Sequence, residues 1–209
     1  MMQSLQVREE TAVFSPLLRQ YTLEEFFALP DPDNRSHYEL IGGFLFMVPP
    51  PDEPHDSIDA LLAASLHRHL ISHNITGQVH HPRAPIYTDD TYVEPDMKYI
   101  SDDLLKRMAG KRNSADIVFE YASKSSAVYD RTTKADTYLA LGVRELWLVD
   151  SDTRTIEVRY ATTHKGQPAW ETWIFGSGDF AESRVLPGWK VSVDELFAGL
   201  TTLKPRENG

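Results

Sequence analysis

The sequence between residues 115 and 150 constrains the fold more than any other part of the chain. Residues 115–123 (ADIVFEYAS) form a compact apolar run rich in β-formers and interrupted by one glutamate, and residues 144–150 (RELWLVD) form a second apolar run. Between them, Asp130 to Leu141 has the pattern of a helix, with Gly142 as its C-cap. This strand–helix–strand order predicts a parallel crossover within a sheet.

The segments before this unit contain further helix and hairpin signals. Thr22 and Glu25 form a capping box, which predicts a short helix that ends at about Leu29. Gly42-Gly43 lies between two short apolar runs within residues 37–50 and predicts a hairpin. Residues 55–73 carry apolar side chains at helical spacing, which predicts a helix with one buried face. The side chains expected on that face are Ile58, Leu61, Leu62, Leu66 and Leu70.

The remaining segments alternate between strand and helix patterns. Strands are expected at residues 78–81, 84–87, 91–100, 155–162 and 168–176, the fourth of them at an edge or half-exposed. Residues 101–115 are polar and in part helical, and residues 193–200 form a closing helix. The pattern predicts an α/β (mixed α+β) fold in which a central mixed β-sheet is flanked by helices. We expect one domain over residues 21–200, an N-terminal arm over 1–20 and a C-terminal tail over 201–209.

The composition excludes several classes of protein. The chain has no cysteine, which excludes a disulfide scaffold, a thiol nucleophile, a zinc finger and an iron–sulfur cluster. Neither a membrane span nor a signal peptide is recognisable, so we expect a cytoplasmic protein with no membrane partner. The formal net charge of −10 argues against non-specific binding to nucleic acid over the whole surface.

The basic side chains are nevertheless concentrated in one stretch. Residues 104–134 carry 7 basic and 3 acidic side chains, whereas the segments on both sides are net acidic. The basic residues are Lys106, Arg107, Lys111, Arg112, Lys124, Arg131 and Lys134. A solvated surface would account for such a cluster. A DNA backbone guided across an acidic protein is the functional alternative, because the cluster surrounds Glu120 in the sequence.

Two carboxylates are candidates for a metal site. Asp96 follows Pro95 at an expected strand end or bulge, and Glu120 interrupts the apolar strand, where burial is costly without a partner. Hard cations such as Mg²⁺ bind to one or two carboxylates together with waters and phosphate. Glu120 would otherwise lie on the polar face of an edge strand. A third carboxylate, Glu39, lies at the start of the hairpin, where a surface strand position is the alternative.

Lys134 lies on the helix that follows Glu120. Asp130 precedes it by four residues, so an ion pair within a solvent-facing helix would explain the lysine. Tyr138 lies four residues later on the same face. The functional alternative is that Lys134 reaches the end of the Glu120 strand and stabilises negative charge in a transition state.

Several of these elements, in this order, resemble the Uma-two family of restriction-endonuclease-like proteins within the PD-(D/E)XK nuclease superfamily. The elements are YELIGG, VEPDM, DIVFEYASKSS, DRTTKADTYLALGVRELWLVD and LPGWKVSVDELF, and the resemblance extends from about Thr22 to Leu200. It implies a restriction-endonuclease-like core. Each short element is common by itself, whereas the ordered set is specific.

The resemblance also implies roles for individual residues. Asp96 corresponds to the metal-binding aspartate, and Glu120 to the glutamate of the second element. The superfamily lysine normally follows that glutamate by two residues, but Ala122 stands there. Lys134 matches the helical lysine that substitutes for it in this family, and Lys124 is a weaker candidate. Glu39 matches an early acidic position and His55 a histidine that opens the long helix.

These observations lead to a hypothesis and its alternatives. The leading one is an endonuclease that uses Mg²⁺ or Mn²⁺ to hydrolyse DNA phosphodiester bonds, with Asp96 and Glu120 as metal ligands and Lys134 as the electrostatic stabiliser. The absence of the standard lysine motivates an alternative, a nuclease fold that binds nucleic acid without cleaving it. A two-carboxylate glycoside hydrolase is a third alternative that nothing in the spacing favours. A homodimer is expected if both DNA strands are cut.

Overall fold

The structure of the protein is a computed structural model. It describes residues 19–32, 36–50, 55–122, 126–198 and 200. No helix among these residues is both long and apolar enough to cross a membrane. The expected arm over 1–20 and tail over 201–209 lie almost entirely outside the described residues.

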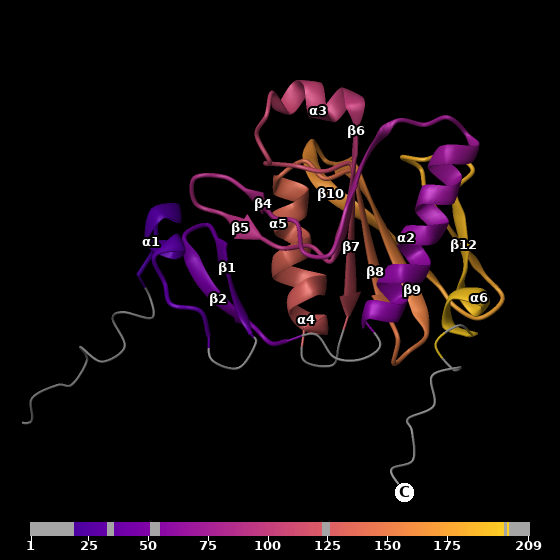
Figure 1. Ribbon diagram of the computed structural model, residues 1–209, viewed down its shortest axis with the longest axis horizontal. Coiled ribbons are helices and arrows are strands. Elements are labelled where there is room, and N and C mark those ends of the chain that lie inside the picture. The colour runs from indigo at the N-terminus through magenta and orange to yellow at the C-terminus, as the bar shows by residue number, and fades with distance from the viewer. Residues whose placement is uncertain (1–18, 33–35, 51–54, 123–125, 199, 201–209) are drawn as a thin grey trace, which may run out of the picture.

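A six-stranded mixed sheet forms the centre of the molecule (Figure 1). The strand order is β10-β9-β8-β7-β6-β3. The strands are β3 (Gly77–His80), β6 (Met97–Ser101), β7 (Ile117–Ala122), β8 (Glu145–Asp150), β9 (Thr155–His164) and β10 (Gln167–Phe175). β7 and β8 are parallel, and the other neighbouring pairs are antiparallel. The predicted parallel crossover and the predicted mixed sheet are therefore confirmed.

The crossover helix differs from its prediction in two ways. It begins at α4 (Ala127–Tyr129), continues through a π-helical stretch, η3 (Asp130–Lys134), and ends in α5 (Ala135–Ala140). The helix thus begins three residues before Asp130, after Ser126 at the N-cap, which makes no side-chain capping hydrogen bond. π-Helical turns are rare and occur often at functional sites. Gly142 follows the helix with a φ of +78°, as expected for a glycine that terminates a helix.

Apolar side chains cover both faces of the central sheet. On one face, Trp147 packs with α2 (His55–Ser72), α6 (Val193–Ala198) and the small pair of strands β11 (Phe180–Glu182) and β12 (Lys190–Ser192). On the other face, Leu148 packs with α5 and α3 (Asp102–Met108). Because side chains alternate along a strand, β7 directs Phe119 to the first face and Val118 to the second.

A second sheet of four short strands, in the order β2-β1-β5-β4, lies beside the central sheet. It contains the predicted hairpin of β1 (His37–Ile41) and β2 (Phe44–Val48), together with β4 (Ile86–Tyr87) and β5 (Tyr92–Val93). The predicted capping box begins the short helix α1 (Leu23–Phe27). The strand expected over residues 91–100 is instead divided into β5 and β6, in different sheets, because the chain crosses between the sheets at Glu94–Asp96 and Pro95 cannot donate a ladder hydrogen bond.

Three further parts of the fold differ from the expectations or go beyond them. Leu61 is 40% exposed, because the buried face of α2 is centred on Ile58, Leu62 and Leu66. The strand expected at an edge or half-exposed is β9, which is half-exposed as expected, with residues 161–164 exposed, but lies between β8 and β10 and is not an edge strand. β11 and β12 were not predicted, since strands of three residues are too short to show a period.

Candidate active site

The central sheet brings Asp96 and Glu120 together. Asp96 directly precedes β6, and the antiparallel register that pairs Met97 with Phe119 places Asp96 opposite Glu120 on β7. The backbone N–H of Tyr121 donates to Oδ2 of Asp96 over 2.7 Å, which fixes this carboxylate beside Glu120. The alternative that Glu120 lies on the polar face of an edge strand was wrong, because β7 is an inner strand and the Glu120 side chain is 4% exposed.

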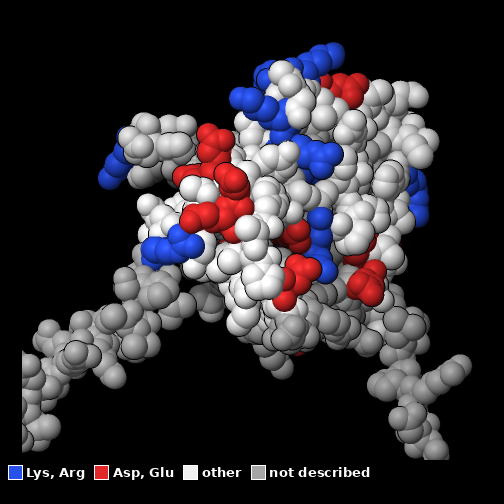
Figure 2. Space-filling view, turned by 60° about the vertical axis from the view of Figure 1, so that its left-hand side comes forward, with Lys and Arg blue, Asp and Glu red and all other residues white. Residues whose placement is uncertain are grey.

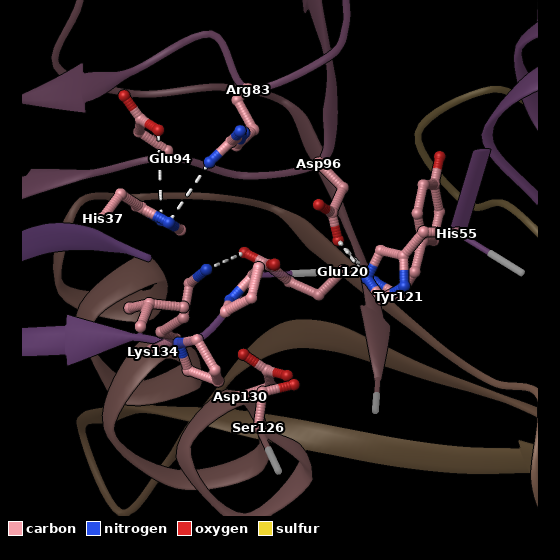
Figure 3. Close-up of a pocket in the computed structure, with 13 residues that line it drawn as sticks. His37, His55, Arg83, Glu94, Asp96, Glu120, Tyr121, Ser126, Asp130 and Lys134 are labelled. Carbon is pink, nitrogen blue, oxygen red and sulfur yellow. Dashed lines mark hydrogen bonds and ion pairs between the residues drawn. The ribbon is translucent and has the colours of Figure 1, made fainter. Parts of the chain in front are cut away.

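Lys134 is buried against Glu120 (Figure 3). Its Nζ lies 2.8 Å from Oε1 of Glu120 and 3.3 Å from Oε1 of Glu39. The hydroxyl of Tyr138 donates to the same Oε1 of Glu120. The alternative of a solvent-facing lysine paired with Asp130 was therefore wrong, because Lys134 is buried and pairs with carboxylates of two other elements.

Glu39 is a buried residue of β1 and not a surface residue. Its carboxylate accepts hydrogen bonds from the backbone N–H of Glu94 and from the hydroxyl of Tyr129, both over 2.8 Å. Burial alone would raise the pKa of Glu39, but the ammonium of Lys134 and the surrounding donors lower it to about 2. Glu39 is therefore ionised, and together with Glu120 it holds the ammonium of Lys134 in place.

The carboxylates around Lys134 are crowded. Burial raises the pKa of Asp96 and raises that of Glu120 well above its ordinary value, and the neighbouring carboxylates Asp96 and Asp130 add to the effect at Glu120. Burial opposes the charge of Lys134, but Glu120 and Glu39 raise its pKa above the ordinary value. Lys134 is therefore a fixed cation in a site with more negative than positive groups, and such a site favours an additional cation.

These side chains line a cavity of about 40 Å³, which we call the carboxylate cavity. Asp96, Glu120, Asp130 and Lys134 all contribute to its wall. Its volume exceeds the roughly 10–15 Å³ that one water molecule requires. A second cavity of about 310 Å³, which we call the adjoining cavity, shares four lining residues with it. The shared residues are His55, Arg83, Asp96 and Tyr121.

His55 lies beside the carboxylate pair, as its position in the sequence suggested. It is the first residue of α2, and its Nε2 lies 3.8 Å from Oδ2 of Asp96. Its ring meets the ring of Tyr121 edge-on, with 5.7 Å between the centroids. The Tyr121 hydroxyl in turn donates to Asp59 over 2.9 Å, so that α2 is anchored to β7 next to the site.

The predicted DNA-binding residues lie elsewhere. Arg131 donates to Asp150 and Glu157 over 2.9 and 3.1 Å, so it joins the crossover helix to β8 and β9, and its role in DNA binding stays a prediction. Lys106, Arg107, Lys111 and Arg112 are exposed, on or after α3. Because α3 follows the end of β6 that is distant from Asp96, and because none of the four lines the carboxylate cavity, the structure does not bring these residues into the site. Lys124 lies outside the described residues.

Sequence reasoning missed other residues of the site. Asp130 lines the carboxylate cavity, and its spacing of four residues from Lys134 was a usable signal. Glu94 lines the same cavity, and it lies within the VEPDM element that contains Pro95 and Asp96. Arg83 and His37 also line this wall, but neither lies in a motif, so no sequence signal identified them.

Comparison with known proteins decides the family. A family model described as "Putative restriction endonuclease" matches residues 23–194. The chain belongs to the Uma2 family. This confirms the resemblance predicted from the ordered elements.

Solved structures confirm the fold of this Uma2 protein. A crystal structure from Anabaena variabilis, titled as a putative nuclease belonging to DUF820, superposes with a TM-score of 0.68 at 20% sequence identity. The match covers 86% of this chain and 99% of that chain. The likeness shows the shared restriction-endonuclease-like fold. No curated protein matches the sequence.

Proposed function

We propose that this Uma2 protein is a divalent-metal-dependent endonuclease that hydrolyses DNA phosphodiester bonds. The observation that carries the proposal is the meeting of Asp96, Glu120 and Lys134 in the carboxylate cavity, from three separate elements. The buried carboxylate of Glu120 and the half-buried carboxylate of Asp96, beside a fixed cation, form a site suited to phosphoryl chemistry, in which charge must be neutralised and oriented. Membership of a family described as restriction endonucleases supports the same conclusion.

The chemistry of the site fits Mg²⁺ or Mn²⁺. Among the described residues there is no cluster of three or more His, Asp or Glu side chains arranged to hold a metal ion. A hard cation held by Asp96 and Glu120 would take its remaining ligands from water and phosphate, as Mg²⁺ commonly does. Among the described residues, Tyr138 and Lys134 both contact Oε1 of Glu120, which would leave the other carboxylate oxygen for a cation. When bound, such an ion lowers the pKa of water and neutralises phosphate charge.

The residues of the chain have distinct tasks in this proposal. Tyr138 and Lys134 fix the orientation of Glu120, and Tyr121 fixes that of Asp96. Lys134 remains protonated between Glu120 and Glu39, so its ammonium is the donor for negative charge that develops on the phosphate. Lys134 thus occupies the role of the superfamily lysine, which is absent at Ala122.

A plasmid-nicking assay tests the proposal directly. Purified protein with Mg²⁺ or Mn²⁺ is expected to convert supercoiled plasmid to nicked and linear forms, and EDTA is expected to prevent this. A Glu120→Gln preparation purified in parallel controls for contaminating nucleases. Retained DNA binding with no cleavage by any divalent ion or on any form of DNA would support the alternative, a non-catalytic nucleic-acid-binding module.

The exposed basic residues at α3 are proposed to contact the DNA backbone away from the cleavage point. Figure 2 shows blue side chains gathered at the top of this face, at the level of α3, with a band of red side chains below them. Changing Lys106, Arg107, Lys111 and Arg112 together to serine should weaken binding. The slope of log affinity against log salt should fall by about 0.9 for each phosphate that the protein no longer neutralises. An unchanged slope would show that the cluster is only solvated surface.

We add a location and an oligomeric state to this proposal. We propose that the protein acts on DNA in the cytoplasm. We also propose that it acts as a homodimer, because cleavage of both strands of a duplex takes two sites and closed two-fold assemblies are the commonest oligomers.

A further inference from the structure

Arg83 places a second positive charge at the site. It is exposed and lines both the carboxylate cavity and the adjoining cavity. Apart from Lys134, no other lysine or arginine among the described residues lines the carboxylate cavity. Lys134 is buried between two carboxylates, whereas Arg83 forms no ion pair with a described carboxylate. Its charge is therefore available to an anionic ligand.

The segment that carries Arg83 is held from several sides. The backbone N–H of Arg83 donates to the carbonyl of Asp96 over 3.3 Å, and the residue adopts a φ of +48°. His81 contacts Asp59 on α2 over 2.7 Å. The buried ammonium of Lys98 donates to the carbonyl of Pro85 over 2.7 Å. These contacts fix the backbone of the segment against β6 and α2. The side chain of Arg83 therefore extends from a defined backbone position next to Asp96.

His37 orients the guanidinium. Nη1 of Arg83 lies 3.2 Å from Nδ1 of His37, as the dashed line in Figure 3 shows. Because arginine can only donate, Nδ1 of His37 must accept, and the imidazole carries its proton on Nε2. That Nε2 lies 3.9 Å from a carboxylate oxygen of both Glu39 and Glu94, which favours this tautomer. His37 is thus set to receive one N–H of Arg83, while the guanidinium has further donors for a ligand.

We propose that Arg83 binds a phosphate of the nucleic-acid backbone at the exposed side of the carboxylate cavity, and that His37 is its positioning residue. The planar guanidinium matches the spacing of two phosphate oxygens, and its charge cannot be removed at working pH. The junction of the two cavities at Asp96 is the place where a bound phosphodiester would meet Arg83 and the carboxylate pair together. The assignment of the ligand rests on the proposed nuclease function.

Binding of a fluorescein-labelled 20-base-pair duplex tests this role without cleavage. Measured by anisotropy in EDTA, Arg83→Gln should bind about tenfold more weakly than wild type. Its slope of log affinity against log salt should be smaller by about 0.9. Arg83→Lys should keep the slope, since the charge remains. Its affinity should fall by a few fold, because lysine lacks the planar guanidinium that donates to two phosphate oxygens at once. Arg68→Gln, at an exposed position farther along α2, is the matched control and should behave as wild type.

The variant His37→Ala tests the positioning. Its affinity should fall less than that of Arg83→Gln, and the double variant should bind no more weakly than Arg83→Gln alone, because His37 acts through Arg83. If the losses in binding free energy of the two single variants add up in the double variant, the role of His37 is wrong. If Arg83→Gln binds DNA as Arg68→Gln does, in both affinity and slope, the phosphate-binding role is wrong. Because binding is measured without metal, a wild-type protein that fails to cleave leaves this result decisive.

Discussion

Asp96→Asn is expected to reduce metal-dependent DNA cleavage by about 10³-fold or more. The reason is that a metal ligand contributes several kcal/mol of charge stabilisation, and each 1.4 kcal/mol is about tenfold in rate. The asparagine keeps the shape of the side chain and an oxygen that can accept from the N–H of Tyr121. Single-turnover cleavage of a labelled duplex, with folding checked by circular dichroism, measures the loss.

Metal binding itself supplies a readout independent of catalysis. A ligand that binds only the folded state raises the melting temperature. At a concentration of 100 times its Kd, it adds about 2.7 kcal/mol to the free energy of unfolding. Wild type should show this rise with Mn²⁺, and Asp96→Asn and Glu120→Gln should largely lose it. Asp103→Asn on α3, with a side chain 90% exposed, is the matched control and should keep it. Identical responses from wild type and both site variants would remove the metal site from the proposal.

The same substitution has an expected effect on the metal-free protein. Burial and the neighbouring carboxylate of Asp59 raise the pKa of Asp96, which means that its charged form costs free energy of folding at neutral pH. Asparagine removes this charge. Asp96→Asn should therefore be as stable as wild type, or more stable by up to about 1 kcal/mol, in chemical denaturation with EDTA.

Lys134→Met is expected to have the second large effect, on stability as well as on cleavage. Methionine leaves the carboxylates of Glu39 and Glu120 buried without their cation. Breaking a buried ion pair in this way costs about 3–5 kcal/mol, which chemical denaturation would measure as a lower free energy of unfolding. Cleavage by the folded fraction should fall by at least about 10²-fold, because a transition-state donor is lost.

The double variant Lys134→Met/Glu39→Gln separates these two effects. Removing the charge of Glu39 relieves one of the unpaired carboxylates, so part of the lost stability should return. Cleavage should not return, because the ammonium is still missing. Recovery of cleavage together with stability would show that Lys134 is only structural, and an undisturbed stability in the single variant would contradict the buried ion pairs.

The sequence by itself determined the order of the elements and most of the chemistry. The parallel crossover followed from two apolar runs on either side of a helix, because strands buried on both faces must be apolar and a helix between them returns the chain. Glu120 was identified because a carboxylate within an apolar strand is costly to bury without a partner, and Asp96 because it follows Pro95 at an expected strand end and matches the aspartate of the family's elements. The ordered elements then indicated the family, which the comparison confirmed.

Only the tertiary structure decided which charges are neighbours. The sequence alone left Lys134 two possible partners, Asp130 within its own helix or the end of the Glu120 strand, and it left Arg131 in the basic cluster without a partner, because helical spacing shows only neighbours on one helix. Packing of that helix on the sheet instead pairs Lys134 with Glu120 and Glu39, and Arg131 with Asp150 and Glu157. Arg83 and His37, 46 residues apart, meet only through the fold. Ion pairs depend on distance in space, and contacts between distant segments leave no period or motif in the sequence.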